Sequence, residues 1–368
     1  MLYRKLGRSG VKVSAISFGS MRFPSEEACH QIIHRGLDLG MNYIDTSTGY
    51  VGGKSQAWAG RAVRGRRSEI YFSGKSNWAQ APTADAVRKT IEKSLEATGL
   101  DYFDFYQLWG LQSTEVVERA VAKGGTVEGI EKARAEGLIK YGLGFTFHGP
   151  PEAFQAAVDS GALLCATVSY NIINRKEEPL IAYAGGRGVG VIIMNPLAGG
   201  VLGLAGEKSL DFLRDGHRGP WYGALRFLLA NRNISTSIIG FTAAEEVDQA
   251  VQALQGAETL DEPYRQQLIR KMEAVKFIQG DFCTGCGYCK ECPNGFDPQK
   301  FMQVMRDFAI YGVDERDLAH WIRSKYPHQD PVEQLKRCTE CGECQEKCPQ
   351  HLEIVEQIQK AKAALSID

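Results

Sequence analysis

The chain has 368 residues, of which 43% are hydrophobic and 24% are charged, the proportions of an ordinary folded protein with a sizeable core. One large domain of roughly 250 residues with a small appendage accounts for this length. The formal net charge of −1 gives no general attraction to nucleic acid or to an anionic membrane, so we expect neither as a partner. No export signal precedes the first predicted strand and no stretch approaches a membrane-spanning length, so we expect a cytoplasmic protein.

Between residue 10 and about residue 255, short apolar runs alternate with longer amphipathic stretches. The amphipathic stretches include predicted helices over residues 25–39, 83–98 and 243–254, and Ser25 is a suitable N-cap for the first. The alternation indicates repeated βα units, and strands that are apolar on both faces are typical of a parallel sheet covered by helices. The predicted strands span residues 15–20, 42–47, 70–75, 103–109, 141–147, 162–171, 189–195 and 235–241.

Eight such strands predict an α/β fold, a closed (β/α)8 TIM barrel over residues 1–260. An open doubly wound sheet is the alternative. It would usually carry a G-x-G-x-x-G motif after its first strand, and residues 18–21 lack that spacing.

Residues 261–368 are predicted to form a second, smaller helical domain, which holds eight of the ten cysteines. Apolar residues recur at helical spacing over residues 296–326, which predicts two helices there. Ten cysteines in a chain without an export signal favour metal ligation over disulfides. The first run consists of Cys283, Cys286, Cys289 and Cys292 before a proline, and the second of Cys338, Cys341, Cys344 and Cys348 before a proline.

Successive spacings of two residues place three thiolates around one side of a compact cluster, and in two-cluster ferredoxins the fourth ligand comes from the other run. We therefore predict a ferredoxin-like domain with two [4Fe-4S] clusters. Structural zinc is the alternative, although zinc gains nothing from a third evenly spaced cysteine. Cys29 and Cys165 stand alone and are expected to be buried free thiols. The predicted ligand sets are Cys283, Cys286, Cys289 and Cys348 for one cluster, and Cys292, Cys338, Cys341 and Cys344 for the other.

Asp45 and Tyr50 follow the second predicted strand, and Lys75 ends the third. Because barrel active sites lie at the carboxyl ends of the strands, we expect the three side chains to converge. A buried lysine ammonium stabilises a neighbouring phenolate, which predicts a lowered pKa for Tyr50 and a role as general acid. Asp45 would keep Lys75 charged and oriented. The alternative is a buried Asp45–Lys75 ion pair that only supports the barrel.

These residues give the chain its resemblance to the aldo-keto reductases, which extends from residue 3 to residue 247. The resemblance is carried by Asp45, Tyr50 and Lys75, and by the segments at 105–108, 144–149 and 195–200. The cysteine-rich tail resembles the iron–sulfur subgroup of that family. The resemblance implies an NADPH- or NADH-binding barrel that acts on an aldehyde, ketose or sugar-like small molecule.

One departure from the family is Trp109, which stands where the resemblance places a catalytic histidine on the fourth strand. An indole is larger than an imidazole and offers a single N–H donor, so we expect Trp109 to reshape the substrate pocket. His148 lies in one of the matching segments, and its residue type fits a loop residue as well as a substrate contact.

The resemblance also implies a set of cofactor contacts. Glu246 stands near a position that carries arginine in NADP-preferring members, and a carboxylate there suits a free 2′-hydroxyl, which favours NAD(H) over NADP(H). The predicted cofactor-binding residues are Gly19, Met21, Thr146, Thr167, Asn171, Met194, Pro196, Leu197, Gly240, Thr242 and Glu246.

Nicotinamide transfers two electrons as hydride, whereas each cluster passes one, and no flavin signature is present to join them. The first of three hypotheses is an NAD(P)-dependent oxidoreductase acting on a carbonyl or alcohol, with structural or redox-sensing clusters. In the second, the clusters relay electrons from a redox protein partner to a substrate in the barrel, and Tyr50 handles the proton. In the third, Trp109 marks a barrel that has lost reductase activity and serves as a scaffold.

Overall fold

The computed structural model of the protein describes residues 1–203, 208–275, 283–311, 313–326 and 330–367. Eight parallel strands form a closed barrel, in which the last strand pairs with both the first and the seventh. Each predicted barrel strand is present, so the predicted (β/α)8 TIM barrel is confirmed. The strands are β3 (Ile16–Gly19), β4 (Tyr43–Asp45), β5 (Tyr71–Asn77), β6 (Phe103–Trp109), β7 (Ile139–Thr146), β8 (Cys165–Ser169), β9 (Gly190–Met194) and β10 (Ile234–Ile239).

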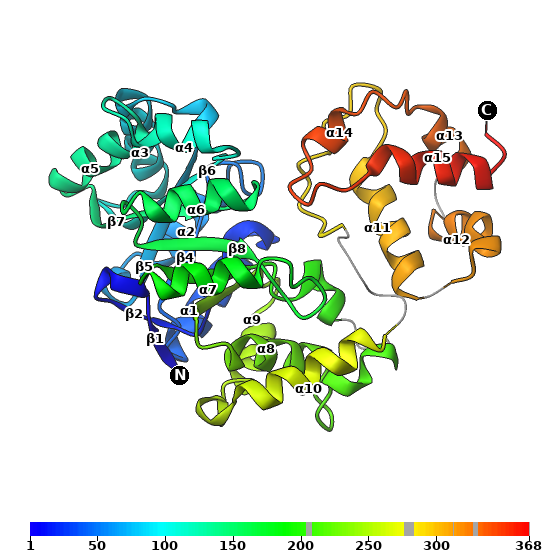
Figure 1. Ribbon diagram of the computed structural model, residues 1–368, viewed down its shortest axis with the longest axis horizontal. Coiled ribbons are helices and arrows are strands. Elements are labelled where there is room, and N and C mark those ends of the chain that lie inside the picture. Colours follow the sequence, from blue (N-terminus) through cyan, green and yellow to red (C-terminus); the bar gives the residue numbers. More distant parts are fainter. Residues whose placement is uncertain (204–207, 276–282, 312, 327–329, 368) are drawn as a thin grey trace.

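Helices surround the strands (Figure 1). The three helices predicted from amphipathic spacing are confirmed as α1, α3 and α9. The hydroxyl of Ser25 accepts a hydrogen bond from the Ala28 amide at the start of α1, which is the cap expected from the sequence. The helices of this layer are α1 (Glu26–Asp38), α2 (Ser55–Ala62), α3 (Ala84–Thr98), α4 (Thr114–Val121), α5 (Thr126–Ala135), α6 (Pro151–Asp159), α7 (Glu178–Gly186), α8 (Pro220–Ala230), α9 (Ala244–Gln252) and α10 (Glu262–Glu273).

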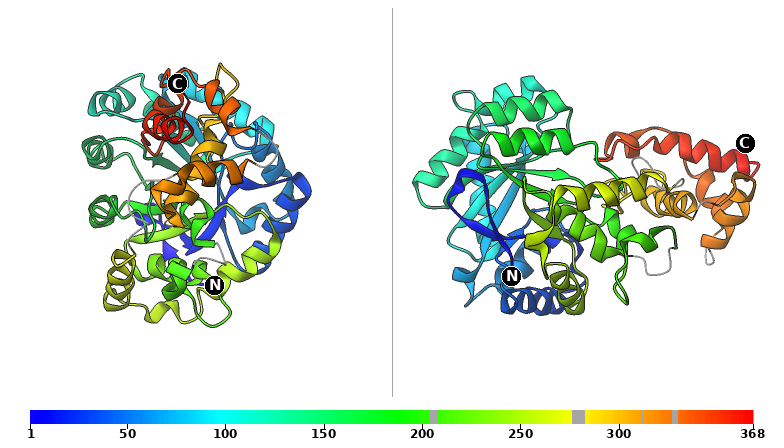
Figure 2. Two further views of the ribbon diagram at one scale, coloured as in Figure 1. Left: turned by 90° about the vertical axis from the view of Figure 1, so that its right-hand side faces the viewer. Right: turned by 60° about the horizontal axis from the view of Figure 1, so that its bottom comes forward.

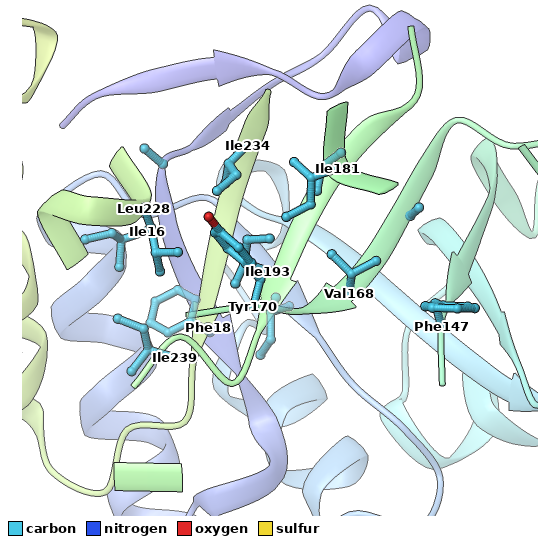
Figure 3. Packing of buried hydrophobic residues seen from close by; sticks show 14 of the residues in the cluster. Ile16, Phe18, Phe147, Val168, Tyr170, Ile181, Ile193, Leu228, Ile234 and Ile239 are labelled. Atoms are coloured by element: carbon cyan, nitrogen blue, oxygen red, sulfur yellow. The ribbon is translucent and has the colours of Figure 1, made fainter. Parts of the chain in front are cut away.

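The core of the barrel has two layers. The outer layer lies between strands and helices, and Figure 3 shows part of it, including Ile16, Ile193 and Leu228. The inner layer fills the interior of the barrel with residues such as Tyr43 and Phe105. Successive strand residues point to opposite faces, so each strand contributes to both layers. Cys29 and Cys165 are buried and free, as predicted.

An antiparallel hairpin of β1 (Tyr3–Lys5) and β2 (Lys12–Ser14), which the sequence did not predict, covers the amino end of the barrel. Its Leu6, Val11 and Val13 side chains belong to the inner layer of the core. The hairpin closes this end of the barrel, so the interior can receive a ligand at the carboxyl end.

The C-terminal domain has a hydrophobic core of its own, which includes Phe301, Ile322 and Ile358. The two helices predicted between the cysteine runs are confirmed as α11 and α12. The domain lies beside the barrel at the end toward which β8 points (Figure 1, Figure 2). Its helices are α11 (Pro298–Ile310), α12 (Leu318–Lys325), α13 (Pro331–Lys336), α14 (Glu343–Glu346) and α15 (Ile354–Ala364).

Helix α10 follows residue 260, at which the sequence analysis divides the chain. Its Leu268, Ile269 and Met272 side chains belong to the outer layer of the barrel core, so this helix packs with the barrel. The division at residue 260 stays a prediction. Among the described residues, no helix combines the length and the apolar character needed to cross a lipid bilayer.

Candidate active site

A cavity of about 450 Å³ lies at the carboxyl end of the barrel strands. The cavity is lined by the predicted catalytic residues Asp45, Tyr50 and Lys75, and by Trp109, which stands at the position where the resemblance places a fourth catalytic residue. The C-terminal domain supplies a second wall, which sequence reasoning did not anticipate. The residues of that wall are Thr284, Cys286, Tyr288, Pro349 and Gln350.

Lys75 is the centre of a hydrogen-bonded group. Its Nζ atom lies 2.8 Å from Asp45 Oδ1 and 3.3 Å from the Tyr50 hydroxyl. Burial alone would lower the pKa of Lys75, but the charge of Asp45 and the contact with Tyr50 outweigh it and hold that pKa above its ordinary value. Lys75 is therefore a cation at neutral pH, paired with a buried carboxylate.

Tyr50 differs from the sequence-based prediction. Burial raises its pKa above the ordinary value, and the attraction of Lys75 offsets only part of this effect. The predicted lowering of the Tyr50 pKa is therefore wrong, because desolvation of the phenolate outweighs its stabilisation by Lys75. Tyr50 is protonated across the neutral range, which is the form that can donate a proton.

Gln107 connects the catalytic group to the rest of the barrel. Its amide nitrogen donates to Asp45 Oδ2 at 2.7 Å, and its amide oxygen accepts from the hydroxyls of Thr146 and Thr167, each at 2.8 Å. From the sequence, Gln107 is expected only as part of the segment at residues 105–108 that resembles the family. Its position two residues before Trp109, on the same face of β6, was the signal for an inward side chain.

Two of the predicted cofactor-binding residues do not line the cavity. The Thr167 hydroxyl is directed at Gln107, and the Asn171 side chain donates to the Asn195 carbonyl oxygen at 3.1 Å. Both therefore support the walls, and a cofactor contact by either residue stays a prediction. The nine predicted cofactor-binding residues that do line the cavity are Gly19, Met21, Thr146, Met194, Pro196, Leu197, Gly240, Thr242 and Glu246.

Two cavity residues that the sequence analysis missed are Ser20 and Ser169. Their hydroxyl oxygens are buried and have no hydrogen-bond partner within the described part of the chain. Most buried polar atoms in proteins are satisfied, so such a pair calls for a polar ligand. The carboxamide of a nicotinamide ring offers a donor and an acceptor, so these residues fit that group.

The far end of the cavity carries a carboxylate at the start of α9. Glu246 accepts hydrogen bonds from the backbone nitrogen and the hydroxyl of Thr242, at 2.7 and 2.9 Å. Helix N-termini commonly bind phosphate, and here the carboxylate takes up donors that a phosphate would need.

His148, in the loop after β7, also lines the cavity. Burial, Lys75 and His351 lower its pKa to about 4, so the ring is neutral at pH 7. His351 Nε2 lies 3.0 Å from the His148 carbonyl oxygen, and the His148 ring in turn is hydrogen-bonded to the Pro349 backbone. The residue therefore joins the barrel to the C-terminal domain at the edge of the cavity.

Each predicted set of cluster cysteines surrounds a cavity of the C-terminal domain. One is lined by Cys283, Cys286, Cys289 and Cys348. The other is lined by Cys292, Cys338, Cys341 and Cys344, and Cys289 also borders it. Among the described residues, no three His, Cys, Asp or Glu side chains converge on a point that a single metal ion could occupy. A four-thiolate set spread around a cavity fits a multi-iron cluster.

The two cysteine runs have matching backbones. The sulfur of Cys283 accepts a hydrogen bond from the Gly285 amide, and the sulfur of Cys338 accepts one from the Glu340 amide, both at 3.4 Å. Gly285 and Glu340 have φ angles of 68° and 58°, in the left-handed region. The left-handed turn aims amide groups at sulfur, an interaction that tunes the potential of iron–sulfur clusters.

Comparison with known protein families matches residues 15–266 to the Aldo/keto reductase family. The chain belongs to this family. Residues 279–352 match a 4Fe-4S dicluster domain, which confirms the predicted iron–sulfur subgroup. This aldo/keto reductase is an oxidoreductase in which a TIM barrel and an iron–sulfur domain share one chain.

Similar proteins cover the length of the barrel but not the whole chain. L-galactose dehydrogenase of Arabidopsis thaliana is 27% identical, over 74% of this chain and 93% of its own length. L-glyceraldehyde 3-phosphate reductase of Escherichia coli (strain K12) is 27% identical, over 69% of this chain and 88% of its own. The solved structure of aldo-keto reductase AKR11C1 from Bacillus halodurans in its holo form has a TM-score of 0.64 at 26% identity, covering 74% of this chain and 96% of that protein.

Two double variants test the crossed cluster assignment. Cys286→Ala with Cys348→Ala removes two ligands of one predicted cluster, so anaerobically purified protein should keep about half of its roughly eight iron atoms. Cys286→Ala with Cys292→Ala removes one ligand from each predicted cluster, so it should lose iron from both. Iron and acid-labile sulfide analysis measures both, with Cys29→Ala as the control. If Cys286→Ala with Cys292→Ala kept more iron than Cys286→Ala with Cys348→Ala, each run would bind its own cluster.

Proposed function

We propose that this aldo/keto reductase transfers hydride between NAD(H) and the carbonyl or alcohol group of a small aldehyde, ketose or sugar-like substrate. The observation that carries the proposal is the group of Asp45, Lys75 and Tyr50, hydrogen-bonded at the wall of a cavity whose lining also includes Ser20 and Ser169. An acid beside a buried cation and a site for a polar ring are the parts that carbonyl reduction requires.

Different residues of the chain donate the proton, stabilise the resulting charge and hold the site in place. A bound nicotinamide would supply hydride to the substrate carbon. The Tyr50 hydroxyl donates its proton to the carbonyl oxygen, and Lys75, 3.3 Å away, stabilises the phenolate left on Tyr50. Asp45 and Gln107 hold the lysine in place. In alcohol oxidation the Tyr50 phenolate accepts the proton instead.

The two ends of the cavity support the choice of ligands. Glu246 at the start of α9 favours a dinucleotide with a free 2′-hydroxyl, as in NAD(H). Trp109 and Tyr288 offer aromatic faces of the kind that pack on the apolar side of sugars. The names of the relatives, which refer to L-galactose and L-glyceraldehyde 3-phosphate, support a polyhydroxylated substrate. Two [4Fe-4S] clusters on the eight cysteines complete the proposal, with a structural or redox-sensing role.

Dinucleotide binding is the first test. Anaerobic fluorescence titration of the cluster-loaded protein should give a lower Kd for NADH than for NADPH. Glu246→Arg should shift the preference toward NADPH by about tenfold or more, because a guanidinium replaces a carboxylate beside the 2′-position. Glu245→Arg, the exposed neighbour on α9, is the matched control. If the native chain bound neither NADH nor NADPH, the proposal would be wrong.

Proton donation is the second test. Tyr50→Phe should lower kcat for NADH-dependent carbonyl reduction by at least about a hundredfold and leave the NADH Kd unchanged. Because burial raises the Tyr50 pKa, the native rate of reduction should stay level across neutral pH and fall only above the ordinary tyrosine value of about 10. Stopped-flow absorbance at a series of pH values measures both. A native turnover rate in Tyr50→Phe would rule out this role.

A second candidate function is delivery of single electrons to the barrel from a redox protein partner. One observation favours it: Cys286 borders both the barrel cavity and the first cysteine cavity, and Cys289 borders both cysteine cavities. Cys341, on the second cysteine cavity, is exposed. Residues of the predicted cluster ligand sets thus extend from the surface to the barrel cavity.

EPR spectroscopy separates the two candidates. Protein reduced with dithionite, freed of excess reductant and mixed with DL-glyceraldehyde in the absence of nicotinamide should keep its reduced-cluster signal if only hydride transfer operates. Electron delivery to the substrate predicts that the signal decays upon mixing.

A further inference from the structure

The barrel does not supply the full set of polar groups that its resemblance to the family implies. Trp109 ends β6 at the position where the resemblance places a histidine that orients the substrate carbonyl. Lys75 is already engaged with Asp45 and Tyr50. The neutral ring of His148 is hydrogen-bonded to the Pro349 backbone. Besides Tyr50, which supplies the proton, the cavity wall offers the Trp109 indole N–H and the residues of the C-terminal domain as further donors.

Tyr288 of the C-terminal domain is placed to provide such a donor. Its ring lies 6.1 Å from the Trp109 ring, centroid to centroid, at an interplanar angle of 57°. It lines the same cavity as Tyr50 and Lys75. The residue is 39% exposed, so its side chain is open to a ligand. A phenol presented to a cavity in this way is a hydrogen-bond donor for a ligand.

The segment around Tyr288 packs closely against the barrel. Arg22 donates to the Thr284 carbonyl oxygen at 2.6 Å. The Thr284 backbone lies so close to Gly199 that a Cβ atom on that glycine would be 2.6 Å from Thr284 Cα. On the other side, His351 contacts the His148 backbone. Close backbone approach of this kind fixes the position of the segment relative to the strand ends.

We propose that Tyr288 is a substrate-binding residue of the barrel, whose hydroxyl donates a hydrogen bond to the substrate carbonyl oxygen while Trp109 holds its ring. The inference rests on the proposed function and extends it to the C-terminal domain. Cys286 and Cys289, predicted ligands of one cluster, flank Tyr288, so ligation at both restricts the backbone between them. The iron–sulfur domain thereby becomes part of the substrate site.

Tyr288→Phe tests this assignment because it keeps the ring on Trp109 and removes only the hydroxyl. The full chain, purified anaerobically with its clusters, is assayed with NADH and two probes, DL-glyceraldehyde and butyraldehyde. KM should rise about three- to tenfold for both probes with a smaller change in kcat, since one neutral hydrogen bond is lost. Tyr311→Phe, an exposed tyrosine of the same domain, should keep native constants.

Each other outcome overturns the assignment. Native KM values in Tyr288→Phe would show that the hydroxyl does not bind substrate. A KM change for DL-glyceraldehyde alone would place the bond on a substrate hydroxyl, because butyraldehyde has only its carbonyl oxygen. A change in iron content would show that the substitution acts through the cluster. A change in the Kd for NADH would show that it acts through cofactor binding. Failure of the proposed function is separate, since it appears as absent NADH binding in the native chain or full turnover in Tyr50→Phe.

Discussion

The active site depends on one buried ion pair, between Asp45 and Lys75. Removing two charges from water costs several kcal/mol per ion, and their attraction offsets this only when the remaining hydrogen-bonding positions are filled. Here Gln107 donates a hydrogen bond to the second oxygen of Asp45, and Lys75 donates one to the Tyr50 hydroxyl. Gln107 in turn is held by Thr146 and Thr167. Five neighbouring strands, β4 to β8, therefore contribute to one polar network that keeps the acid in position.

The cavity above this network belongs to two domains. Each cysteine cavity takes residues from both runs, so Cys348 of the second run lies beside the cysteines of the first run. The segments beside those cysteines, around Tyr288 and Gln350, are also the outer wall of the barrel cavity. Assembly of the iron–sulfur domain and shaping of the substrate site are therefore linked through the same few residues.

Membership of the family indicates the class of reaction more clearly than it indicates the substrate. The proposed proton-transfer group lies within the barrel, which the relatives share with this chain. The groups proposed to face the substrate are Trp109, which the resemblance places at the position of a histidine, and Tyr288, from a domain outside the family match at residues 15–266. A fold supports many functions, and specificity lies in the residues added to it. The substrate of this protein is accordingly to be sought with the C-terminal domain in place.

The sequence alone determined the features that depend on local pattern: the barrel strands from apolar runs, the capped helices, the two cysteine runs, and the convergence of Asp45, Tyr50 and Lys75 at strand ends. Periodicity and spacing express these directly. Only the tertiary structure decided what depends on contacts between distant segments. It raised the pKa of Tyr50 through burial, bonded Thr167 to Gln107 and Asn171 to Asn195, left Ser20 and Ser169 unpaired within the described residues, and brought Tyr288 to Trp109. Desolvation and packing arise between residues far apart in the chain, so no local pattern carries them.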